Sequence, residues 1–98
     1  MTPESERTRA EDIAEAIGVV IGAASTCNGI GQERLQSTVD KAKDLVMAAA
    51  RDEADAAAAT ARFSSGFEIG QAAVENGRVD PQQAENALSD LERELSII

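Results

Sequence analysis

The sequence predicts an all-α protein in which a long central heptad helix is flanked by two shorter antiparallel helices. Twelve positions spaced alternately by four and three residues run from Leu35 to Val74, and ten of them are apolar or glycine. No proline lies between Gly31 and Asn76. We therefore expect one helix from about Gln32 to Asn76, which at 1.5 Å per residue is roughly 65–70 Å long. The 98 residues fit a single helical domain, 1–98.

The first short helix is predicted to extend from the N-terminus to about Cys27. Thr2 can cap its start, and Pro3 suits the first helical position. Asn28 and Gly29 are typical of the end of a helix, because they adopt the left-handed conformation readily. A tight reversal at residues 29–31 then gives a helical hairpin.

This hairpin fixes which residues of the first two helices face each other. We expect Ile17 to lie near Ala42 and Ile13 near Val46. We also expect Leu35 to meet Ala24. The small-residue pattern Gly18-x-x-x-Gly22 in the first helix indicates close helix packing in a soluble chain.

The last helix has the clearest local signal in the chain. Asp80 provides a cap, Pro81 the first helical residue, and Gln83 the second half of a capping box. Asn76-Gly77 closes the preceding helix. In the expected antiparallel layout this last helix covers the second half of the central helix, and three pairs result: Leu91 with Phe67, Leu95 with Phe63, and Leu88 with Gly70.

The main structural alternative is a break in the central helix at Ser64-Ser65-Gly66. Glycine beside serines weakens helix propensity there by about 1 kcal/mol. A compact four-helix monomer would result. The heptad pattern passes through Phe63 and Phe67 without a slip, which favours the continuous helix.

Homodimerisation is the expected consequence of the extended layout. Hydrophobic residues make up 43% of the chain, but a large share of them are alanines, and Phe63 and Phe67 are the only aromatic residues. One copy therefore has little apolar area to bury. Val19, Val20 and Ile21 also point in directions too far apart for one neighbouring helix to cover. The predicted dimer interface comprises Val19, Ile21, Val46, Ala49, Glu53, Ala56 and Phe63.

The charge and cysteine content narrow the class of partner. The chain carries 18 acidic and 9 basic residues, a net charge of -9, which disfavours nucleic acids and anionic membrane surfaces. The apolar run 16–24 is shorter than a membrane span of about 20 residues.

Cys27 is the single cysteine, so no intramolecular disulfide forms and a reducing cytoplasm is expected.

The residue types argue against catalysis. Histidine is absent, and Cys27 has no imidazole to activate it, so we interpret Cys27 as a small core residue and expect neither an enzyme nor a cofactor. Glu53 occupies a heptad position with Asp52 and Asp55 nearby. Across a dimer axis such carboxylates could hold a metal ion or small ligand, although a register-fixing ion pair with Arg51 or Arg62 is the simpler interpretation.

These observations predict a small acidic helical interaction or structural module. An adaptor or chaperone-like homodimer that binds an unidentified protein partner is the preferred hypothesis. Two alternatives stay open: carboxylate-based metal or small-ligand binding at the dimer centre, and an accessory subunit of an enzyme complex. No family resemblance is evident.

Overall fold

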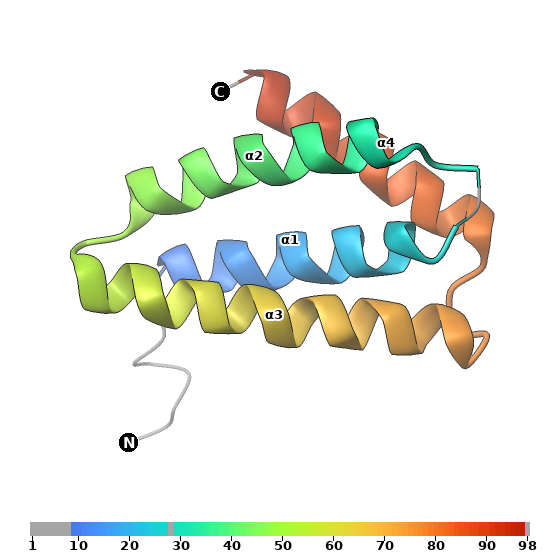
Figure 1. The fold of residues 1–98 in the computed structure, drawn as a ribbon, viewed down its shortest axis with the longest axis horizontal. Helices are drawn as coiled ribbons and strands as arrows, with labels where there is room; N and C mark the ends of the chain where they lie inside the picture. Colours follow the sequence, from blue (N-terminus) through green and yellow to red (C-terminus); the bar gives the residue numbers. More distant parts are fainter. Residues whose placement is uncertain (1–8, 28, 98) are drawn as a thin grey trace.

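The computed structural model describes residues 9–27 and 29–97, and within those residues it is all-helical, as predicted. Four helices follow one another along the chain: α1 (Arg9–Ser25), α2 (Gln32–Ala49), α3 (Glu53–Glu75) and α4 (Pro81–Ile97). Successive helices run in opposite directions, so α1 and α3 are parallel, while α2 and α4 return (Figure 1). The predicted start of the first helix at Thr2 and Pro3 lies outside the described residues.

The prediction of one continuous helix from Gln32 to Asn76 is wrong. α2 ends at Ala49, α3 begins at Glu53, and the chain reverses direction between them (Figure 1). The predicted three-helix layout is therefore replaced by four helices. The alternative break at Ser64–Gly66 does not occur either, because those residues lie inside α3.

Two carboxylates cap the start of α3 directly after the break. Asp52 adopts an extended conformation, and its Oδ1 accepts a hydrogen bond from the Asp55 backbone N–H at 2.8 Å. The Asp55 Oδ2 in turn accepts from the Arg51 backbone N–H at 2.9 Å. A helix start leaves such amide groups without intrahelical partners, and this reciprocal cap satisfies two of them.

Glycines allow α1 and α3 to pack with their backbones in contact. A Cβ atom at Gly22 would overlap the carbonyl oxygen of Phe67, and a Cβ atom at Gly70 would lie only 2.7 Å from the backbone nitrogen of Ala23. Both helices contribute a Gly-x-x-x-Gly pair to this contact: Gly18 and Gly22 from α1, Gly66 and Gly70 from α3. The packing interpretation of the first pair is confirmed.

α1 is the central helix of the fold and contacts each of the other three. Ile17 and Ala42 share a buried cluster, and Val46 packs in another with Ile13 alongside, as the hairpin prediction requires. The wide apolar surface of α1 does need several neighbouring helices. The same chain supplies them, so this requirement does not by itself demand a second copy.

α4 does not cover the second half of the former central helix, which corrects the predicted pairing. It lies mainly against α1 and α2. Leu88 is fully buried in a cluster with Ala24 and Ile30, whereas Gly70 faces α1. The reason is geometric: once the chain turns at residues 50–52, α3 packs its glycines on α1, and the turn after α3 returns α4 to the opposite side of α1.

The predicted end of α3 and start of α4 are confirmed. Gly77 has a φ of 76°, and its N–H donates to the carbonyl oxygen of Val74 at 3.1 Å. Asp80 Oδ1 accepts from the Gln83 N–H at 2.8 Å, and Gln83 Oε1 accepts from the Asp80 N–H at 3.0 Å. This is a complete capping box. The predicted end of the first helix at Asn28 and Gly29 depends on Asn28, which lies outside the described residues.

Candidate interaction groove

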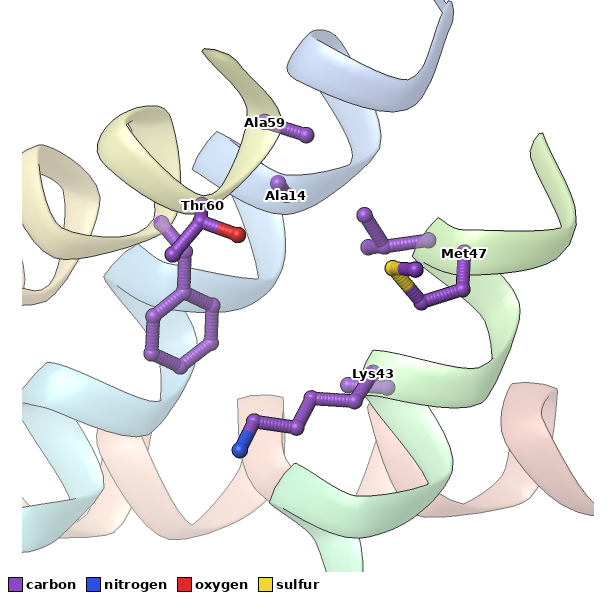
Figure 2. Close-up of a pocket in the computed structure, with 8 residues that line it drawn as sticks. Ala14, Lys43, Met47, Ala59 and Thr60 are labelled. Atoms are coloured by element: carbon purple, nitrogen blue, oxygen red, sulfur yellow. The ribbon is translucent and has the colours of Figure 1, made fainter. Parts of the chain in front are cut away.

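The strongest candidate site is an apolar pocket of about 150 Å³ where α1, α2 and α3 converge (Figure 2). Ala14 and Ala59 lie at its back, and Met47 and Lys43 extend from α2 toward α3. Phe63 forms part of the α3 wall. The lining is almost entirely apolar, which is typical of surfaces that receive an apolar group.

The sequence explains why the helices leave this space open. Ala14, Ala42 and Ala59 are each at most 1% exposed, so all three occupy the point where the helices meet. Their methyl groups are too short to fill the space between α2 and α3, whose mutual contact is slight. The remaining volume stays accessible from the surface.

Met47 stands at the mouth of this pocket with 61% of its surface exposed. Among the described residues it and Ile69, at 55%, are the exposed large hydrophobic residues. A flexible thioether side chain adapts to differently shaped apolar partners. Its position beside an apolar hollow distinguishes it from a singly exposed surface residue.

A second hollow of about 560 Å³ lies further along the same pair of helices. Ile21 of α1 lies among its lining residues, with Leu35 and Val39 of α2 and Phe67 of α3. Both hollows are bounded by α1, α2 and α3. We call the two together the α2–α3 groove.

Charged groups are sparse in this groove. Among the residues that the structure describes, Lys43 is the one ionisable residue lining the first hollow, and Glu33 is the one lining the second. The hydroxyl of Thr60 donates to the carbonyl oxygen of Ala56 at 3.0 Å, so its proton is already engaged. The groove therefore offers apolar contact with one positive group in the first hollow and one negative group in the second.

The structure places the seven residues of the predicted dimer interface in different environments. Ile21 and Val46 are buried within the single chain at 2% and 7% exposure. Val19 lies against Gly70 of α3, and Glu53 is exposed at the start of that helix. The remaining three are partly buried: Ala49, Ala56 and Phe63.

No group of three or more potential metal-ligating side chains occurs within residues 9–27 and 29–97, Glu53 and its neighbours included. Asp52 and Asp55 instead bind backbone amides at the helix start. Cys27 packs at the edge of the buried cluster around Leu88 but is partly exposed, so it is not the fully buried core residue that the sequence predicts.

Sequence reasoning missed the residues that shape the pocket. Met47 follows the heptad residue Val46 and lies just outside the heptad pattern. A large apolar side chain at such a position is the one feature of the sequence that indicates an exposed apolar residue here. Thr60 falls on the heptad spacing of the predicted continuous helix. Its role beside the pocket depends on the reversal of the chain, which the pattern does not contain.

Comparison with protein-family models, curated proteins and solved structures found no match to this chain. None of the helices in the described part of the chain combines the length and hydropathy needed to cross a bilayer.

Proposed function

We propose that this chain is a non-catalytic helical module that binds a protein partner through the α2–α3 groove. The observation that carries the proposal is the apolar pocket between α1, α2 and α3 with Met47 exposed at its mouth. An apolar side chain of the partner inserts there and loses its contact with water, which is the main source of affinity in such grooves. The occupant we favour is a helix, because a groove between two helices accommodates a third.

The acidic composition supports a protein partner over a nucleic acid or an anionic membrane. The single cysteine fits a reducing cytoplasm as the place of action. A homodimer remains a separate prediction. Its original reason, an extended chain unable to cover its own apolar residues, does not apply to a chain in which α2, α3 and α4 surround α1.

Site-specific photo-crosslinking in cells that naturally make the protein tests this proposal. A photoreactive residue at Met47 should give a discrete crosslinked product, because position 47 lines the groove. The same residue at Ala61, which is exposed on α3 and lines none of the described hollows, is the matched control.

The mass of the product separates the outcomes. A product containing a different protein, formed from position 47 and not from position 61, supports the proposal. A product of twice the chain mass assigns the groove to a second copy and contradicts a heterologous partner. Equal crosslinking from both positions, or none from position 47, contradicts the groove as the binding surface.

A further inference from the structure

A second groove lies on another side of the molecule, between α1 and α4. Its volume is about 410 Å³, and Leu45 of α2 also lines it. Ile13 and Val20 contribute apolar side chains from α1, and Leu91 contributes one from α4. We call this surface the α1–α4 groove.

The charged groups that line the α1–α4 groove, in the part of the chain that the structure describes, are acidic. Asp90 and Glu94 lie one turn apart on α4 and both are exposed, and among the described residues no basic side chain lines the groove. Arg93 is 3.9 Å from Asp90, but both side chains are at least 70% exposed, so solvent screens this pair strongly. The surface therefore combines an apolar floor with a negative rim.

We propose that the α1–α4 groove binds a basic amphipathic helix of a partner protein. The apolar floor requires an apolar stripe on the occupant, and the carboxylates of Asp90 and Glu94 select lysine or arginine beside that stripe. The net charge of -9 also attracts a basic partner before it makes contact with the groove. A second copy of the same chain fits poorly, because it brings the same negative charge to a negative rim.

The dimensions of the groove set the length of the occupant. The lining runs from Ile13 to Val20 on α1, which is roughly 10 Å of helix, and over a similar length on α4. A partner helix then places apolar residues at i, i+3 or i+4, and i+7 against the floor. A helix rather than an extended segment is expected, because the described chain offers no sheet edge whose backbone could pair with an added strand.

Binding of a model peptide to the full chain tests this inference. The probe is a 16-residue helix with leucines along one face and lysines on both sides of that face, and the control peptide carries glutamate in place of every lysine. We expect the glutamate peptide to bind at least about tenfold more weakly by calorimetry, because its charges repel the rim. Affinity for the lysine peptide should also fall as salt is raised.

Matched variants separate this groove from general attraction to an acidic protein. Asp90→Asn with Glu94→Gln removes two charges from the rim, whereas Glu68→Gln with Glu75→Gln removes two exposed charges from α3. The first pair should weaken binding about fivefold or more and the second less than about twofold, since screened charges act over short distances. Ala16→Gln, at an exposed position of the floor, should weaken binding with the rim intact.

Methyl NMR locates the peptide and keeps this inference apart from the proposed function. Shifts at Ile13 and Val20, with Met47 unchanged, support the α1–α4 groove. Shifts at Met47 alone would contradict this inference while leaving the α2–α3 groove as a binding surface. Equal weakening by both double variants, equal affinity for both peptides, or no binding would also overturn it.

Discussion

Gly22 of α1 lies directly against the backbone carbonyl of Phe67 in α3, so that a methyl group at position 22 would overlap that oxygen. Phe67 is in a helix that the heptad pattern joins to α2, yet its backbone belongs to the tightest contact of α1. This backbone contact holds α3 against α1. It is possible only when α3 turns back alongside α1.

Gly22→Ala should lower the free energy of unfolding by about 1–3 kcal/mol, the usual cost of overpacking. This is a net loss, although alanine in place of glycine favours an isolated helix by about 1 kcal/mol. Urea denaturation measures the change. Gly29→Ala is the control, because a Cβ atom at Gly29 meets nothing within 4 Å among the described residues. Stabilisation by Gly22→Ala would show that α1 and α3 do not pack as described.

Asp55→Ala should destabilise the protein by about 1–3 kcal/mol, because the Arg51 N–H loses its acceptor at the start of α3. The side chain of Arg51 is 75% exposed and lies 3.6 Å from the carboxylate, so Arg51→Ala should cost far less. Thermal unfolding of the two variants compares them. Equal losses would assign the stabilisation to the ion pair instead of the backbone hydrogen bond.

Arg34 links α2 to α4 through Glu92 and Ser89. Its Nη2 donates to Glu92 Oε1 at 2.6 Å and to Ser89 Oγ at 3.0 Å. The hydrogen bond with Glu92 raises the pKa of Arg34. The stabilisation of the folded state by this shift is therefore lost as the pH rises into the strongly alkaline range, where Arg34 loses its proton.

Glu92→Gln should therefore cost about 1 kcal/mol or less, since both side chains are about one-third exposed. The loss should shrink as salt is added, because screening weakens the pair in the unmodified protein. Unfolding free energies at low and high ionic strength provide the measurement. A salt-independent loss would indicate that packing, rather than charge, is what the glutamate contributes.

Asp80→Ala should destabilise α4 by about 1 kcal/mol, because the Gln83 N–H loses the carboxylate that accepts from it at 2.8 Å. Gln82→Ala removes only an exposed contact with Asn86 and serves as the control. Chemical denaturation distinguishes the two. If Asp80→Ala and Gln82→Ala behave alike, the capping box has no energetic role.

Local signals in the sequence were sufficient for the features that depend on neighbouring residues. The capping box at Asp80 and Gln83 and the helix end at Gly77 are fixed by residues within one turn, and the structure confirms both. The pairing of α1 with α2 follows from a short turn and a heptad pattern. It needs no knowledge of the rest of the fold.

The break at residues 50–52 escaped prediction because it contains neither glycine nor proline. Ala50 and Asp52 interrupt a run that heptad spacing and alanine content both favour as helix. Asp52 followed by Asp55 was a possible capping pair, but the same two residues also suit a helix surface. Tertiary contact favours the break over a continuous helix, because folding back brings Gly70 against α1.

The candidate grooves could not be predicted from the sequence for the same reason. Gly66 was interpreted as a weak point in a helix, whereas it is a contact point that complements the glycines of α1. Met47 becomes a groove residue only because α2 and α3 both pack against α1 and face the same pocket. Each of these roles depends on residues distant in sequence, which a periodic pattern does not report.

A distance between spin labels at Gln36 and Glu68 tests the reversal of the chain between α2 and α3 most directly. Cys27→Ala removes the native thiol, both labelled positions are exposed, and dilution with unlabelled protein removes signals between copies. Gln36 lines the same hollow as Phe67, so we predict a single population far shorter than the roughly 48 Å that a continuous helix would place between them. A population centred near that longer distance would contradict the four-helix fold and both grooves built on it.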